Sequence, residues 1–157
     1  IHGGGHERSM RSGTLATHQI AGMGEAFALA TSEGEADQAR IQGLRDRLLE
    51  AIADLDGVHC NTRLETSVPN IINLGFEGVD GESLLMALRD IALSTGSACN
   101  SASVEPSYVL QGIGVPRRLA LASLRLSLGR FTSEDDIDRA GQALRTALIG
   151  LRQRAMP

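Results

Sequence analysis

The chain has 157 residues, a hydrophobic content of 42% and a formal net charge of -4 at pH 7, values typical of one soluble globular domain with an adequate core. The negative charge argues against general binding to nucleic acid or to anionic membranes, and no apolar run approaches the roughly 20 residues of a membrane helix. The first residues carry no secretion signal and two cysteines are too few for a disulfide scaffold, so the expected location is the cytoplasm.

All 15 basic residues of the chain are arginine, so lysine is absent. Schiff-base chemistry needs a lysine amine, and this chain cannot supply one. The sequence also starts at Ile1 with a glycine-rich stretch that precedes any expected helix or strand. We therefore expect the chain to be the later portion of a longer polypeptide.

Two helical patterns follow an expected N-terminal loop over residues 1–13, which are rich in glycine, histidine, arginine and serine. Thr14 stands where a helix N-cap would be, before apolar residues spaced by three or four. A second amphipathic helix is expected over residues 35–55, with charged residues such as Arg45 off its apolar face. Residues 32–34 either break two helices or bend one long helix.

Beyond residue 57, expected strands alternate with expected helices. The strands are expected over residues 58–61, 70–76 and 124–128. In the last of these, leucines alternate with Arg125 and Ser127, so Arg125 points away from the core. Helices are expected to begin at Asp80 and extend to Ile91, to begin at Pro106, and to begin after an N-cap at Ser133. This order implies an α/β sandwich with helices packed on a small, mostly antiparallel sheet.

One cysteine lies in a setting that suits chemistry. Cys99 is in the middle of residues 94–103, which are otherwise small or polar. Such a setting leaves the thiol exposed, and the thiolate is both a nucleophile and a metal ligand. The alternative is a small residue in a flexible loop. The other cysteine, Cys60, follows His59 in an expected edge strand, where a structural role is favoured.

The sequence also indicates two anion sites. Residues 3–14 join flexible glycines to two arginines and end at the expected helix N-terminus, which suits a phosphate, although Thr14 could serve only as an N-cap. Arg125 offers a planar guanidinium that matches a carboxylate, although an arginine on the polar face of a strand more often forms a surface ion pair. The four histidines lack the spacing of a zinc site, so no metal is assigned.

Four segments together resemble the C-terminal part of cysteine desulfurases of the NifS/IscS-like group, in the class V aminotransferase family. In chain order they are GGGHERSMRSGTLATHQIAGMGEA, PNIINLGFEGVDGESLLMALRD, STGSACNSASVEPSYVL and SLRLSLGRFTSEDDID. The segment around Cys99 is similar to the long-loop subgroup. The His-His-Cys pattern of the short-loop subgroup is missing.

The resemblance implies the C-terminal small domain of a fold-type I transferase that depends on pyridoxal phosphate and works as a homodimer. Residues 1–30 would be the tail of the large cofactor domain, and residues 31–157 would be the small domain with the cysteine loop. The lysine that anchors the cofactor belongs to the part of the family's sequence that would precede Ile1. This chain alone is therefore expected to be inactive.

The resemblance also implies the chemistry. The enzyme would convert L-cysteine to L-alanine and carry the sulfur as a persulfide on Cys99, with the cofactor as electron sink. Arg125 would hold the substrate carboxylate, and Thr14 would reach the cofactor phosphate of the other subunit. The sulfur would pass to an acceptor or iron-sulfur scaffold protein for cluster assembly, and Cys99 could also be a transient ligand of a nascent cluster.

Two alternatives belong to other functional classes. The chain could be a stand-alone sulfur carrier that accepts persulfide from a donor, or a redox-sensing domain in which Cys99 passes through sulfenic acid. A carrier or sensor has no use for a cofactor-phosphate segment before Thr14. The presence of that segment favours the desulfurase.

Overall fold

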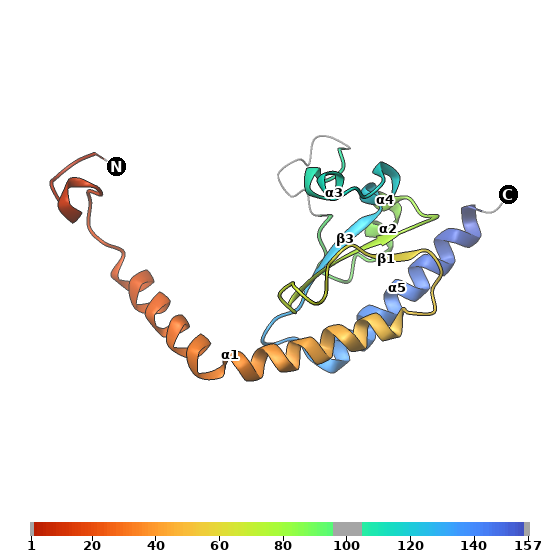
Figure 1. The fold of residues 1–157 in the computed structure, drawn as a ribbon, viewed down its shortest axis with the longest axis horizontal. Coiled ribbons are helices and arrows are strands. Elements are labelled where there is room, and N and C mark those ends of the chain that lie inside the picture. Colours follow the sequence, from red (N-terminus) through yellow and green to blue (C-terminus); the bar gives the residue numbers. More distant parts are fainter. Residues whose placement is uncertain (1, 96–104, 156–157) are drawn as a thin grey trace. The chain divides into compact units, whose positions relative to one another are not determined.

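The computed structural model describes residues 2–95 and 105–155 (Figure 1). The chain divides into two compact units, residues 1–36 and 37–157. A long helix, α1 (Thr17–Ala51), starts in the first unit and ends in the second. It runs through residues 32–34 without a break, so the two helical patterns of the sequence belong to one continuous helix.

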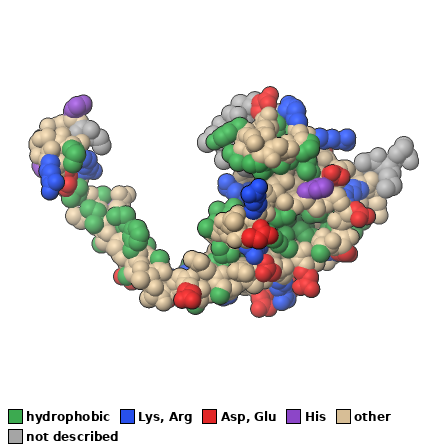
Figure 2. Space-filling view, viewed as in Figure 1, with side chains coloured by type: hydrophobic (Ala, Val, Ile, Leu, Met, Phe, Trp, Pro, Cys, Tyr) green, Lys and Arg blue, Asp and Glu red, His purple; other side chains and the backbone are tan. Residues whose placement is uncertain are grey.

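The first unit consists of an N-terminal loop, which includes the short 3-10 helix η1 (Glu7–Ser9), and the first part of α1. The expectation that Thr14 caps the helix is wrong, because α1 starts at Thr17 and the carbonyl of Ala16 accepts its first hydrogen bonds. Most side chains of this unit are exposed, and Figure 2 shows hydrophobic ones on its surface. The apolar residues whose spacing predicted the helix stay exposed within the unit: Leu15, Ile20, Met23 and Phe27.

Three antiparallel strands form the sheet of the second unit, in the order β1 (Val58–Cys60), β2 (Ile71–Phe76) and β3 (Ser123–Ser127). The three expected strands are confirmed to within one residue at each end. Leu74 of the central strand pairs with Cys60 on one side and with Leu124 on the other. Cys60 therefore lies on an edge strand, as the sequence predicted.

The core lies against one face of this sheet. Leu124 and Leu126, at alternate positions of β3, are only 1% and 5% exposed. The second half of α1, together with α2 (Gly81–Ala87) and α5 (Glu134–Ala155), covers this face (Figure 1). The Ser133 hydroxyl accepts a hydrogen bond from the Asp136 amide at 3.2 Å, which confirms Ser133 as the predicted N-cap of α5.

Two short helices follow Pro106: α3 (Tyr108–Gly112) and α4 (Arg117–Leu121). The expected helix start at Pro106 is wrong, because Ser107 is the N-cap of α3. Gly114 has a φ of 85°, which suits a glycine and ends α3 in a turn. Helix α2 is also shorter than expected, since it ends at Ala87, with Leu88 as its C-cap, instead of extending to Ile91.

Arg45, which was expected off the apolar face of α1, is only 6% exposed. Its Nε and Nη2 atoms donate to Oδ1 of Asp46 at 3.0 and 2.9 Å. A long arginine stem can be buried while its charged end meets a carboxylate nearer the surface. Helical periodicity missed this burial because it treats arginine as polar along its whole length.

Two arginine–aspartate pairs connect α5 to α1 and to the turn after it. Arg47 donates to both carboxylate oxygens of Asp138 at 2.7 Å, and these hydrogen bonds lower the pKa of Asp138. Arg145 pairs in the same way with Asp54, and its hydrogen bonds lower the pKa of that carboxyl. Both pairs lie at the surface, so they orient the helices more than they stabilise the fold.

We expect Gly81→Ala to lower the free energy of unfolding by about 3 kcal/mol. A Cβ atom at Gly81 would lie 2.1 Å from the carbonyl oxygen of Leu121, which is backbone and cannot turn aside. Urea denaturation measures the change. Gly43→Ala is the matched control, because nothing lies within 4 Å of a Cβ there. Alanine is a better helix former than glycine, so the free energy of unfolding of this variant should be unchanged or higher by up to about 1 kcal/mol. Equal stabilities of the two variants would contradict the close approach at Gly81.

Candidate functional site

Arg125 lies on the face of the sheet opposite the core. Its strand neighbours Leu124 and Leu126 are buried, whereas Arg125 is exposed, as the alternation of the sequence predicted. In the register of the sheet Arg125 is directly opposite Asn73 of β2. Cross-strand partners project to the same face, so these two side chains share the open face.

The chain segment that contains Cys99 starts beside Arg125. The Arg125 amide donates to the carbonyl of Ser94 at 2.7 Å, and the Ser94 amide donates to the carbonyl of Arg125 at 3.3 Å. Cys99 is five positions after Ser94 in the sequence, so the Cα atoms of the two residues can be at most about 18 Å apart. Cys99 itself lies outside the described residues, so its role stays a prediction.

The guanidinium of Arg125 makes no hydrogen bond or ion pair within residues 2–95 and 105–155. The alternative of a surface ion pair is therefore not found in this part of the chain. A guanidinium carries five N–H donors and accepts nothing, so it is available to an anionic ligand such as a carboxylate.

A polar network that the sequence analysis missed lies on the same face of the sheet. Asn61 Nδ2 donates to Oδ1 of Asn73 at 2.7 Å and to Oγ of Ser123 at 3.2 Å. The Ser123 hydroxyl donates to the carbonyl of Leu119 in α4 at 2.7 Å. Polar residues at Asn61, Asn73 and Ser123 in otherwise apolar strands were the available signal, but their contact depends on strand register.

Thr14 lies in the first unit. Arg11 Nη1 donates to the carbonyls of Gly13 and Thr14 at 2.7 and 3.2 Å, which holds the segment before α1 in place. Thr14 is exposed, and its hydroxyl makes no hydrogen bond to a described residue. It can therefore donate to a phosphate, and this role stays a prediction.

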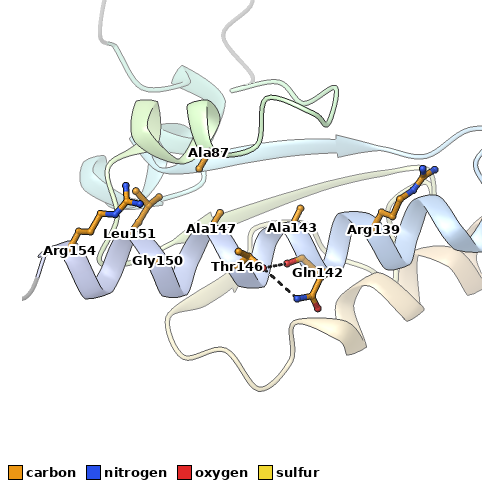
Figure 3. A pocket seen from close by; sticks show the side chains of 9 residues that line it. All are labelled: Ala87, Arg139, Gln142, Ala143, Thr146, Ala147, Gly150, Leu151 and Arg154. Atoms are coloured by element: carbon orange, nitrogen blue, oxygen red, sulfur yellow. Dashed lines mark hydrogen bonds between the residues drawn. The ribbon is translucent and has the colours of Figure 1, made fainter.

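A groove of about 490 Å³ runs along α5 on the helical side of the sheet (Figure 3). Small residues such as Ala143 and Ala147 form its floor, with Ala87 of α2 beside it. Arg139 and Arg154 lie at its two ends (Figure 3). Its lining residues include no Cys, His, Asp or Glu, and Arg125 projects from the other face of the sheet. The groove is thus separate from the candidate site.

Residues 2–95 and 105–155 contain no group of three or more His, Cys, Asp and Glu side chains placed to bind a metal ion. Among the helices of the same residues, none has the length and apolar character needed to cross a membrane.

The family model "Aminotransferase class-V" matches residues 4–140. The chain therefore belongs to the class-V aminotransferase family, which confirms the resemblance drawn from the four sequence segments. Enzymes of this kind depend on pyridoxal phosphate.

Curated relatives carry a more specific name. The chain is 56% identical over 152 residues to "Cysteine desulfurase IscS" of Serratia proteamaculans (strain 568) and 55% identical to the protein of the same name from Klebsiella pneumoniae (strain 342). Each match covers 97% of this chain and 38% of the relative. The chain thus spans little more than a third of the length of these relatives.

Solved structures confirm the expected fold class, an α/β small domain of pyridoxal-phosphate transferases with a small antiparallel sheet packed by helices. A NifS-like protein matches with a TM-score of 0.82 and 31% identity, covering 96% of this chain and 39% of that one. The NifS-like protein from Rickettsia africae ESF-5 matches with a TM-score of 0.80 and 28% identity, covering 94% of this chain and 39% of that one.

Each unit, taken by itself, offers one group with the chemistry that pyridoxal phosphate or its substrate would need. Thr14 offers a hydroxyl donor for the phosphate, and Arg125 offers a cationic group for a carboxylate. No lysine exists anywhere in the sequence, so the aldehyde carbon of the cofactor cannot be bound covalently by this chain.

Proposed function

We propose that this chain is the C-terminal part of a cysteine desulfurase that depends on pyridoxal phosphate, converts L-cysteine to L-alanine and carries the sulfur on Cys99. The observation that carries this proposal is the 56% identity over 97% of the chain to a named cysteine desulfurase. Two features of Arg125 support it: its guanidinium has no partner among residues 2–95 and 105–155, and its backbone pairs with Ser94, five positions before Cys99.

Each residue has one task in this reaction. Arg125 binds the carboxylate of L-cysteine and so orients the substrate on the open face of the sheet. The Cys99 thiolate attacks the substrate sulfur: an S–S bond forms, the substrate C–S bond breaks, and the carbon takes up a proton to give L-alanine. The cofactor, when bound, supplies the electron sink at the substrate's α-carbon.

The organisation of the longer protein follows from the same proposal. Residues 1–30 are the tail of the large cofactor domain, and residues 31–157 are the small domain. The division of the chain after Ala36 supports a boundary in this region. In a homodimer, Thr14 would donate to the cofactor phosphate of the other subunit, and the lysine that anchors the cofactor would come from the large domain.

The sulfur on Cys99 passes to an acceptor or iron-sulfur scaffold protein in the cytoplasm, for cluster assembly. A persulfide at neutral pH is a good sulfur donor to another thiol, because the departing thiolate is stable. Cys99 is also able to ligate a nascent cluster, since the thiolate is a metal ligand.

We expect the full-length protein that carries this chain to form L-alanine and sulfide in equal amounts from L-cysteine when a reductant is present. The chain alone should form neither, since it has no lysine. Amino-acid analysis and a sulfide assay measure the two products. A stand-alone sulfur carrier or a redox sensor makes no alanine, so a full-length holoenzyme without alanine formation would refute the desulfurase.

A further inference from the structure

We propose that Asn73 is a second hydrogen-bond donor to the substrate carboxylate, beside Arg125, and that Asn61 and Ser123 hold its amide in the donating orientation. This inference rests on the proposed function of Arg125 and extends it. The carboxylate would then be bound by two donors on neighbouring strands, Asn73 of β2 and Arg125 of β3.

Asn61, Asn73 and Arg125 form one row across the sheet. Asn73 is the register partner of Arg125, and its carbonyl accepts a hydrogen bond from the Asn61 amide at 2.9 Å, which continues the pairing of β1 and β2 by one residue. Directly opposite residues of antiparallel strands have Cβ atoms about 5 Å apart. Arg125 therefore lies next to Asn73 on the side away from Asn61.

The donors and acceptors of this hydrogen-bond network can be assigned from its last bond, which joins Ser123 to Leu119. The carbonyl of Leu119 can only accept, so the single hydroxyl proton of Ser123 is donated to it, at 2.7 Å. The Ser123 oxygen must then accept from Asn61, and the group of Asn61 that faces it is the Nδ2 amine, at 3.2 Å. The same Nδ2 donates to Oδ1 of Asn73 at 2.7 Å.

This chain of donors determines the orientation of the Asn73 amide. With Oδ1 accepting from Asn61 Nδ2, the Nδ2 amine of Asn73 takes no part in this network and keeps its two N–H groups for another acceptor. Amide orientation is assigned from such networks because oxygen and nitrogen are otherwise alike. The Asn73 backbone is held as well, because its N–H donates to Oγ1 of Thr62 at 2.9 Å.

Ser123 is the most buried residue of the network, at 1% exposed, and it fixes one end of the network in place. A Cβ at Gly75 would lie 2.8 Å from Cδ1 of Leu119 and 3.0 Å from Oγ of Ser123, so the glycine leaves the room that the Ser123 hydroxyl and α4 need. From this anchor the network reaches Asn73, which is half-buried at the border of the open face.

Two donor groups on neighbouring strands, both without an acceptor among the residues that the structure describes, therefore share the open face. Neither the Asn73 Nδ2 amine nor the Arg125 guanidinium has a hydrogen-bond acceptor within the described residues. A carboxylate has two oxygens and about four lone-pair directions, which suits a guanidinium on one side and an amide amine on the other. A neutral ligand without acceptor oxygens would leave both donors unsatisfied.

The test is equilibrium binding to the full-length holoenzyme, followed by the cofactor absorbance. The two probes are L-alanine, which has a carboxylate, and ethylamine, which has the same amine without it. We expect Asn73→Ala to raise the Kd of L-alanine about tenfold, by loss of a hydrogen bond to a charged group, and to leave the Kd of ethylamine unchanged. Asn73→Asp, which is nearly isosteric, should raise the Kd of L-alanine further by placing a negative charge in the site.

Two more variants separate orientation from packing. Asn61→Ala leaves Asn73 in place but frees its amide to rotate, so a smaller rise in the Kd of L-alanine is expected, again without an effect on ethylamine. Asn70→Ala is the matched control, because this asparagine adjoins β2 but its side chain makes no hydrogen bond to a described residue. Both of its Kd values should equal those of the unchanged protein.

The outcomes distinguish this inference from the proposed function. If Arg125→Ala raises the Kd of L-alanine while Asn73→Ala and Asn73→Asp do not, Asn73 is not a carboxylate donor and the inference is overturned. If the Asn73 variants weaken L-alanine and ethylamine equally, Asn73 is only structural, and the inference is again overturned. If Arg125→Ala leaves L-alanine binding unchanged, the carboxylate role proposed for Arg125 fails.

Discussion

Cys99→Ser is expected to lower the rate of L-alanine formation from L-cysteine by a factor of at least about 1,000 in the full-length protein, while the cofactor absorbance stays in place. A serine hydroxyl is not ionised at neutral pH and cannot hold a second sulfur atom as a persulfide. Cofactor binding should persist, because the substitution removes only the sulfur acceptor.

Mass spectrometry of the protein after exposure to L-cysteine and alkylation provides the second measurement. One additional sulfur atom is expected on Cys99 and none in Cys99→Ser. Cys60→Ser is the matched control, since Cys60 is an exposed free thiol on β1 whose Sγ contacts the carbonyl of Thr62 at 3.4 Å. Full activity in Cys99→Ser, or a persulfide found on Cys60 instead, would refute the assignment.

Arg125→Ala should raise the KM for L-cysteine about 100-fold, because the carboxylate loses a charged, two-point hydrogen-bonding partner. The affinity for the cofactor should change far less, since Arg125 is assigned to the substrate. Arg125→Lys keeps the charge without the planar fork, so an intermediate KM is expected.

Arg89→Ala is the matched control for this prediction. Arg89 is also exposed and without a hydrogen bond or ion pair among the described residues, but it follows α2 and is not on the open face of the sheet. Its substitution should leave the KM unchanged. Steady-state kinetics and cofactor titration on the same preparations separate the two affinities, and an unchanged KM in Arg125→Ala would contradict the carboxylate role.

Local features of the fold could be predicted from the sequence because their causes lie within a few residues. The alternation of Leu124, Arg125 and Leu126 shows which side chain leaves the core, since the period of a strand is a local property. Ser133, followed by acidic residues, marks the start of α5 because the cap and its partner Asp136 are only three residues apart.

Other predictions were wrong because the structural feature that decides them cannot be read from the spacing of residue types in the sequence. Thr14 has the right chemistry for a cap, but α1 starts at Thr17, so residue type alone did not locate the helix end. Arg45 has a polar end, but the tertiary structure leaves only 6% of the residue exposed. The break considered at residues 32–34 does not occur. Serine and glycine lower helix propensity there, but the free energy that they cost is smaller than the free energy gained by continuing the hydrogen bonds of the helix.

The sequence by itself determined the family, the position of the thiol at residue 99, the exposure of Arg125 and the lack of a lysine to anchor a cofactor. These depend on residue identity and short spacings. Only the tertiary structure decided that Arg125 meets Asn73 and Ser94, and that Asn61 and Ser123 orient the Asn73 amide. The physical reason is strand pairing: residues up to 62 positions apart, such as Asn61 and Ser123, become neighbours only when the register of three strands is set by burial of their other face.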